Sequence, residues 1–329
     1  MHKGRYIGML LLYVLLLAAC GGKQEEAKTE VILTEKTTMV EESTAIPYLA
    51  PGEPSPEAER ILEDSDASLK ASEKRVISGD NFLDNLYERP FTSLDMDYQP
   101  DLNILTASIS SDEFFYYFTI VLDEVDPISG TLSGNYGVEF DRTQSGRGDM
   151  LVMAASPTTQ WSMNNIKVYI DPDITVGGTK PIVAEAGYDE NGYTDTLEMT
   201  AEKVAWARLV PEDPNAIQIA VSRALLQNAE EFLWGAWADG GVKDPSLFDY
   251  DDHFGPSAAG SPVKGEDYPV KELASLDNTC RLPYGFEATS GIPGMCLSIP
   301  VARPGLSCYC VRPCFTHAGC CLEWSAGCK

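Results

Sequence analysis

The chain has 329 residues, with 50 aspartates and glutamates against 24 lysines and arginines, and a formal net charge of −26. This excess of negative charge repels the phosphates of nucleic acids and of anionic lipid headgroups, so neither is expected as a direct partner. The part expected to fold starts at about Lys74 and has roughly 255 residues, which is enough for one large β domain, or for one domain with an appendage.

The N-terminus is typical of an exported protein. A short basic start precedes an apolar run from Tyr6 to Ala19, which is shorter than the roughly 20 residues that cross a bilayer as a helix. The run ends in Leu17-Ala18-Ala19-Cys20, which resembles the lipobox of bacterial lipoproteins. The resemblance implies that residues 1–19 are a signal peptide and that Cys20 is lipidated, which would leave the protein extracytoplasmic and lipid-anchored to the cell membrane. The alternative is an ordinary cleaved signal with an incidental cysteine.

Residues 20–72 are acidic and rich in Glu, Thr, Ser, Pro and Ala, with only scattered apolar side chains. Such a composition buries too little surface to offset the entropy lost on ordering, so we expect a disordered linker that starts at the lipidated cysteine. The linker would hold the folded part away from the membrane. A short helix around Ile61, Leu62 and Leu69 is an alternative for its end.

Residues 73–240 contain closely spaced strand patterns, rich in β-branched and aromatic residues and bounded by Gly, Pro, Asp or Asn. With no convincing helix between them, these patterns predict a mainly β fold, an antiparallel β-sandwich. Residues 222–229 depart from the pattern and predict one or two helical turns between strands at 217–221 and 232–238. The other expected strands lie within Asn103–Ser110, Glu113–Leu122, Asn135–Asp141, Asp149–Ala155, Trp161–Asp171, Lys180–Asp189, Asp195–Glu202 and Lys203–Val210.

The order of features between Arg75 and Asp239 adds a family resemblance. An Asp-rich entry loop (DMDYQPDLNI), a strand FYYFTIVL, a strand that ends in Asp before a Gly-rich turn, and the segment IQIAVSRALL follow one another. This order resembles family nine carbohydrate-binding modules and the related DOMON domains, and it implies a β-sandwich that binds sugars or, in some DOMON members, haem. Haem ligation usually recruits His or Met. His253 and His317, the only histidines after the signal peptide, lie outside the resembling stretch, so haem is not expected.

Aromatic side chains are candidate ligand contacts, because a flat ring can cover the apolar face of a sugar while carboxylates accept hydrogen bonds from its hydroxyls. Trp234 and Trp237 lie three residues apart in one expected strand, which places their rings on opposite faces, one in the core and one outward. Tyr98, Tyr188 and Tyr193 lie in expected loops beside acidic groups and are equally good candidates. For every one of these rings the alternative is burial in the core.

Clusters of aspartates suggest a structural Ca²⁺, which takes six to eight oxygen ligands from loops of this kind. The strongest candidates lie in two loops: Asp95, Asp97 and Asp101 in the first, and Asp244, Asp249 and Asp251 in the second. Neither loop matches an EF-hand, and the alternative is a solvated loop in a very acidic protein.

The C-terminal quarter divides into a Gly/Pro/Asp-rich wrapping loop over residues 241–279 and a Cys-rich cap over residues 280–329. In an exported chain an even set of cysteines indicates a disulfide-rich loop segment, here with four bridges whose connectivity stays open. The cysteines are Cys280, Cys296, Cys308, Cys310, Cys314, Cys320, Cys321 and Cys328. A zinc site formed by Cys308, Cys310, Cys314 and His317 is the alternative.

No sequence motif of a serine hydrolase, a zinc protease or a P-loop enzyme occurs, so we expect no catalytic activity. A carboxylate-dependent glycoside hydrolase is the enzymatic alternative. The sequence favours a surface-anchored lipoprotein with a non-catalytic module that binds carbohydrate, with calcium as an optional aid. The alternatives are a protein-interaction or adhesion lipoprotein that uses the Cys-rich cap to contact a surface protein, and a structural envelope protein.

Overall fold

The structure is a computed structural model. It describes residues 47–76, 80, 85–177, 192–193, 195–241, 248, 259, 270–288, 291–292 and 294–296, and the backbone of residues 310–313 and 321–324. The predicted signal peptide and the predicted lipidation site, Cys20, lie outside the described residues, as do Tyr188, Asp244, Asp249 and Asp251.

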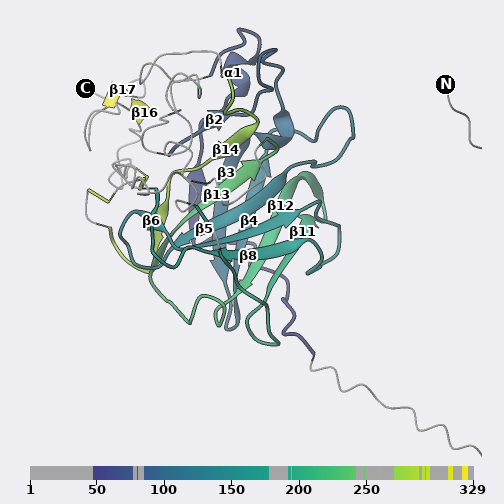
Figure 1. The fold of residues 1–329 in the computed structure, drawn as a ribbon, viewed down its shortest axis with the longest axis vertical. Helices are drawn as coiled ribbons and strands as arrows, with labels where there is room; N and C mark the ends of the chain where they lie inside the picture. Colours follow the sequence, from purple (N-terminus) through teal and green to yellow (C-terminus); the bar gives the residue numbers. More distant parts are fainter. Residues whose placement is uncertain are drawn as a thin grey trace, which may run out of the picture. The chain divides into compact units, whose positions relative to one another are not determined.

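A five-stranded antiparallel sheet forms the first layer (Figure 1). Its strands, in spatial order, are β1 (Arg60–Glu63), β3 (Ile104–Ser111), β4 (Phe115–Leu122), β12 (Asp213–Ser222) and β11 (Ala205–Val210). In β4 the side chains alternate between the two faces: Phe118 and Ile120 enter the main core, whereas Phe115 and Tyr117 pack on the outer face. Successive side chains of a strand point to opposite faces, so both faces of β4 are covered.

An eight-stranded antiparallel sheet forms the second layer (Figure 1). The strands on its main path are β10 (Asp195–Thr196), β8 (Ile166–Ile170), β7 (Met150–Ala155), β5 (Asn135–Asp141), β13 (Phe232–Asp239), β14 (Leu276–Asn278) and β2 (Glu88–Arg89). The eighth strand, β15 (Leu282–Tyr284), pairs with the start of β13. The predicted mainly β, antiparallel fold is confirmed.

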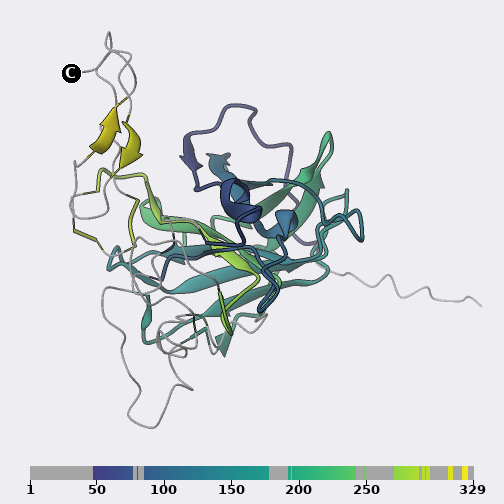
Figure 2. The same ribbon diagram turned by 90° about the horizontal axis from the view of Figure 1, so that it is seen from above.

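Two short helices and two small strand pairs complete the described part of the chain. They are α1 (Ser68–Ala71), the 3-10 helix η2 (Pro100–Leu102), and two small antiparallel pairs. The pairs are β6 (Arg147–Gly148) with β9 (Val176–Gly177), and β16 (Cys310–Pro313) with β17 (Cys321–Trp324), the latter drawn as yellow arrows in Figure 2. The predicted helical turns over 222–229 are present as hydrogen-bonded turns between β12 and β13.

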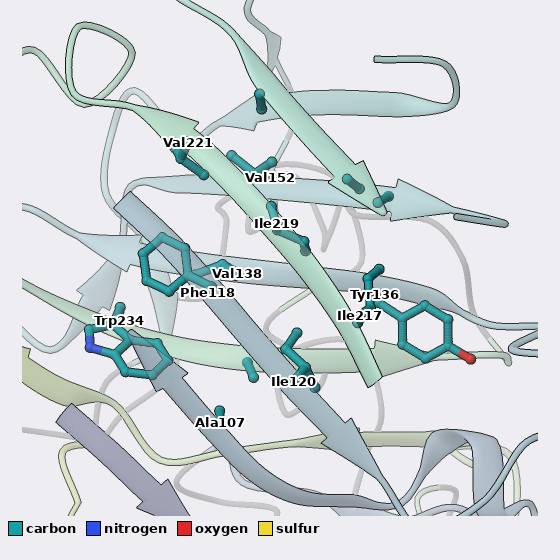
Figure 3. Packing of buried hydrophobic residues seen from close by; sticks show 14 of the residues in the cluster. Ala107, Phe118, Ile120, Tyr136, Val138, Val152, Ile217, Ile219, Val221 and Trp234 are labelled. Atoms are coloured by element: carbon teal, nitrogen blue, oxygen red, sulfur yellow. The ribbon is translucent and has the colours of Figure 1, made fainter. Parts of the chain in front are cut away.

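The inner faces of the two large sheets share one hydrophobic core. Phe118 of β4 lies with its ring centroid 5.4 Å from that of Phe140 of β5 and 5.2 Å from that of Trp234 of β13, so aromatic side chains of both sheets touch directly. Figure 3 shows these strands crossing over one another with their apolar side chains between them. Burial of this apolar area is the main stabilising contribution to the fold.

The outer face of the eight-stranded sheet carries a second cluster, in which Trp237 stacks on Phe248 with ring centroids 4.5 Å apart. Tyr87 and Leu276 belong to the same cluster. Since both faces of β13 are covered, all eight of its residues are buried. A strand buried on both faces reads as a nearly continuous apolar run.

The folded part begins earlier than expected. Residues 60–63 form β1, which pairs with β3, and Leu62 joins the main core. Further upstream, the backbone N–H of Leu49 donates to the carbonyl of Ala201, and Glu53 pairs with Arg208 at 2.6 Å. The prediction of a disordered linker is therefore wrong for residues 47–72, because these long-range contacts supply burial that the local composition does not reveal.

The folded part also ends later than expected. β14 joins the eight-stranded sheet although it lies in the predicted wrapping loop over 241–279, and β15 does so although it lies in the predicted cap. The boundaries at 240 and 279 are therefore wrong. Cys280 and Cys296 form a disulfide across 16 residues, which confirms one pair of the predicted set. The remaining cysteines lie outside the described residues, apart from Cys310 and Cys321, of which only the backbone is described.

Candidate functional site

A polar cavity of about 340 Å³ opens at one end of the two sheets. The end of β12 and the start of β4 meet there, since Ser222 pairs with Phe115, and the start of β1 and the end of β15 lie beside them. The lining residues are Glu59, Arg60, Tyr116, Arg223, Glu230, Glu231, Tyr284 and Gly285. We call this cavity the end pocket.

Two of the residues that line the end pocket, Tyr116 and Tyr284, belong to an aromatic group. The rings of Tyr116 and Tyr284 meet edge to face with centroids 5.2 Å apart, and Phe232 stacks on Tyr284 at 5.1 Å. Phe232 and Tyr284 are direct partners in the β13–β15 register, so they point to the same side of the sheet. Burial raises the pKa of both tyrosines, which therefore stay protonated and able to donate at neutral pH.

Arg223 is held over the ring of Tyr116 by three donated hydrogen bonds. Its Nε donates to the carbonyl of Asp112 at 2.9 Å, its Nη1 to the hydroxyl of Tyr116 at 2.8 Å, and its Nη2 to Ser111 Oγ at 3.1 Å. The guanidinium carbon lies 4.3 Å from the ring centroid of Tyr116. A cation over a ring face is attracted to the ring electrons, which adds to the hydrogen bonds in fixing this arginine.

Glu59 ties the pocket to both sheets. Its Oε1 accepts a hydrogen bond from Ser111 Oγ of β3 at 2.7 Å, and its Oε2 accepts one from the hydroxyl of Tyr284 of β15 at 2.8 Å. Hydrogen bonds to an ionised acceptor are stronger than neutral ones. The carboxylate of Glu59 is therefore fixed in place rather than free in solvent.

Glu230 and Glu231 add two exposed carboxylates on the opposite rim, immediately before β13. Gly285 lies against them with a φ of +79°, and a Cβ atom at this position would overlap the carbonyl oxygen of Glu230. Glycine is thus required for β15 to end so close to these two glutamates. The end pocket presents three carboxylates, two guanidinium groups and two phenols, with a formal charge of −1.

The predicted aromatic platform is not found at Trp234 and Trp237. Their rings do point to opposite faces of β13, as expected, but Trp234 is 1% exposed and Trp237 is fully buried. The expected outward ring is covered by Phe248 and Tyr87. Neither tryptophan can stack on a ligand in this structure.

The predicted tyrosines Tyr193 and Tyr98 both donate hydrogen bonds to carboxylates of the protein. Tyr193 is 2% exposed and donates from its hydroxyl to Glu139 at 2.7 Å, so it serves a buried polar network and no ligand. Tyr98 is half-buried, packs on Phe91 at 5.6 Å and donates to Asp123 at 2.8 Å, which commits its hydroxyl as well. Sequence reasoning missed the end-pocket tyrosines because both sit in strands rather than in acidic loops.

The first predicted calcium loop does not gather its aspartates. Asp95 and Asp97 are exposed, and Asp97 pairs with Lys74 at 3.3 Å, whereas Asp101 is buried and accepts from Ser133 Oγ at 2.7 Å. That calcium site is therefore misplaced. Among the residues that the structure describes, one group of three acidic side chains converges, and it consists of Asp64, Glu88 and Asp277.

No helix within the described ranges is long and apolar enough to span a membrane. No known protein family, curated protein or solved structure matches this chain. The end pocket and the acidic cluster are the features of the described residues that bear on function.

Proposed function

We propose that this protein is a lipid-anchored, extracytoplasmic binding protein that captures a neutral carbohydrate in the end pocket without chemically altering it. The observation that carries the proposal is the lining of that pocket. The fixed carboxylate of Glu59 and the fixed guanidinium group of Arg223 lie beside two tyrosines whose hydroxyls are held by neighbouring groups.

A sugar matches this lining because it offers many hydroxyls on a small, partly apolar ring. Carboxylates accept hydrogen bonds from neighbouring hydroxyls, and Arg223 and Arg60 can donate to ring and hydroxyl oxygens. The pocket volume lies near the lower limit of the roughly 300–1,000 Å³ typical of small-molecule sites. One or two sugar units, or the end of a longer chain, would suit a pocket of this size.

The charge of the pocket narrows the class of glycan. Three glutamates against two arginines give a net charge of −1, and the whole chain carries −26. Both values disfavour sulfated or uronic-acid polysaccharides, which would be repelled on approach. Neutral glycans and amino sugars remain, and we propose the neutral class because Glu59 already has both oxygens engaged by hydroxyl donors.

The proposed lipid anchor would place this binding site at the cell surface. The lipobox-like ending at Cys20 and the described fold starting at residue 47 are separated by an acidic stretch, which supports a tethered binding module at the cell surface. Radiolabelled palmitate incorporation, compared between the parent chain and Cys20→Ala, tests the anchor separately. Equal incorporation in the two chains would remove the lipoprotein part of the proposal.

Binding is tested with the purified chain on a panel of laminarin, xylan, galactan and chitooligosaccharides, with heparin and pectin as anionic comparisons. We expect saturable binding to a neutral glycan and none to the anionic ones. Glu231→Gln should weaken the binding about tenfold, the effect of one lost charged hydrogen bond. Glu212→Gln is the matched control, because this exposed glutamate lies at the other end of β12.

Two outcomes would overturn the proposal. The first is the absence of binding to any glycan by a protein shown to be folded. The second is glycan binding that responds equally to the Glu231 and Glu212 variants, which would place the ligand elsewhere on the molecule.

A further inference from the structure

Three carboxylates converge at the opposite end of β1 from the end pocket. Asp64 directly follows β1, while Glu88 of β2 and Asp277 of β14 are direct partners in the β2–β14 register. One oxygen of each carboxylate lies within 4.8 Å of the other two. We call this group the acidic cluster, and β2 and β14 can be followed side by side in Figure 1.

The acidic cluster contains oxygens that are buried and have no hydrogen-bond partner. Glu88 is 3% exposed and Asp277 is fully buried. Within the described part of the chain, Glu88 Oε2, Asp277 Oδ1 and Asp64 Oδ2 are inaccessible and accept no hydrogen bond from a neighbouring group while all three carboxyls are ionised. A proton on one of them would let Asp64 and Glu88 hydrogen-bond to each other. A buried, unsatisfied charged group is strongly destabilising, so three of them in one place point to a missing partner that is positively charged.

Further carboxylates lie close to Glu88. The carboxylates of Asp64, Asp277 and Asp80 all lie close enough to Glu88 to repel a negative charge on it. Asp80 itself is engaged by Arg89, whose Nε lies 2.6 Å from Asp80 Oδ2. Arg89, the cation next to Glu88 in the sequence, therefore forms its ion pair with Asp80.

We propose that the acidic cluster binds one Ca²⁺ ion. Ca²⁺ prefers carboxylate oxygens at about 2.3–2.6 Å, so two ligands on opposite sides of the ion lie about 4.6–5.2 Å apart. Three oxygens within 4.8 Å of one another can therefore share a single ion. The smaller Mg²⁺, at about 2.1 Å, keeps most of its waters and fits a buried three-carboxylate site less well.

The competing account is proton sharing. A proton between Asp64 and Glu88 would satisfy one pair of oxygens, as in other carboxylate dyads. It would leave Asp277 Oδ1 without a partner, because the other oxygen of Asp277 accepts from the backbone N–H of Ile104 at 2.7 Å. One Ca²⁺ ion would instead give all three carboxylates a cationic partner at once.

The bound ion would join the two layers. Asp64 extends from β1, which belongs to the five-stranded sheet, whereas Glu88 and Asp277 belong to the eight-stranded sheet. The hydrogen bond from Ile104 of β3 to Asp277 of β14 already crosses between the layers at this point. The site is therefore placed where a cation would fix the short strand β1 to the rest of the fold.

The test is Ca²⁺ binding by the purified full-length chain after treatment with a chelator, followed by isothermal titration with CaCl₂ alone. We expect saturable binding that Glu88→Gln weakens at least tenfold, since the substitution keeps the shape of the side chain and removes one charge. Asp95→Asn is the matched control, because it removes an exposed carboxylate from the loop that the sequence favoured. It should leave Ca²⁺ affinity unchanged.

Thermal unfolding gives an independent measurement. A hundredfold excess of Ca²⁺ over its Kd should raise the Tm of the parent chain by about 5–10 °C relative to the chelated sample. Glu88→Gln should abolish this shift, even if relief of charge repulsion raises its Tm in chelator. If Glu88→Gln does not fold, Asp64→Asn serves the same purpose, because Asp64 is partly exposed and lies at the end of its strand.

Each outcome decides the matter. A parent chain that binds no Ca²⁺ and shows no Tm shift leaves proton sharing as the account and overturns the proposal. Ca²⁺ binding that survives in Glu88→Gln and Asp64→Asn would place the ion elsewhere and overturn it equally.

Discussion

Glu59 and Asp64 flank the same four-residue strand. Glu59, just before β1, accepts hydrogen bonds from Ser111 and Tyr284 at the end pocket, and Asp64, just after β1, contributes a carboxylate oxygen to the acidic cluster. The strand itself is short and lies at the edge of its sheet, beside β3 alone. Whatever fixes Asp64 therefore also fixes the position of Glu59.

Removal of calcium should weaken glycan binding. Without an ion at Asp64, the edge strand β1 is held less tightly, and Glu59 is positioned for the ligand a smaller fraction of the time. We expect a severalfold rise in the Kd for the glycan when a chelator is added, measured by titration against the chain saturated with Ca²⁺. The same rise should appear in Glu88→Gln with Ca²⁺ present. An unchanged Kd in both would mean that the two sites are independent.

Phe118→Ala should lower the free energy of unfolding by about 3–5 kcal/mol, the usual cost of a large cavity in a well-packed core. Phe118 is fully buried and contacts aromatic rings of the facing sheet. Phe114→Ala is the control, since Phe114 is 51% exposed and should change the stability by less than about 1 kcal/mol. Urea denaturation followed by tryptophan fluorescence measures both. Equal losses in the two variants would contradict the packing of the two sheets.

The double variant Cys280→Ser, Cys296→Ser should lose about 3 kcal/mol of unfolding free energy. The bridge closes a loop with a sequence separation of 16, and a crosslink of this span restricts the unfolded chain by about that amount. Urea denaturation of the parent and variant chains, both kept oxidised, gives the difference. Identical midpoints would show that this bridge does not form in solution.

Stability should fall as the pH rises through the pKa of Asp171. Burial, with the neighbouring carboxyl of Asp173, raises the pKa of Asp171 from 3.8 to about 6. Because the folded state then holds this proton more tightly than the unfolded state, the contribution to stability is complete below about pH 4 and is lost as the pH rises past 6. From pH 4 to pH 7 the loss would be up to about 3 kcal/mol.

Asp171→Asn isolates this effect from that of other buried carboxyls. An asparagine can still accept the hydrogen bonds that Thr175 and Val176 donate to Asp171, but it does not titrate. We expect the stability difference between the parent chain and Asp171→Asn to grow in favour of the variant between pH 4 and pH 7, measured by urea denaturation at each pH. A constant difference would refute the raised pKa.

The strand pattern could be predicted from the sequence because alternation of apolar and polar side chains is a local property. The segment predicted as Asn135–Asp141 is β5 with those bounds, and the predicted strand around FYYFTIVL is β4. Local composition misled where partners are distant. The stretch around Leu62 reads as polar linker, yet it becomes β1 once β3 is beside it.

The sequence by itself determined that this protein is built from antiparallel strands and carries cysteines suited to disulfides, because these follow from side-chain period and residue type. Only the tertiary structure decided which faces are exposed: the second hydrophobic cluster buries Trp237, which alternation alone would place outward. The tertiary structure also determined which residues meet at the two candidate sites. The end pocket and the acidic cluster each unite residues that are far apart in the sequence, such as Glu59 with Tyr284 and Asp64 with Asp277. Such neighbours are set by long-range strand pairing, on which the spacing of residues along the chain carries no information.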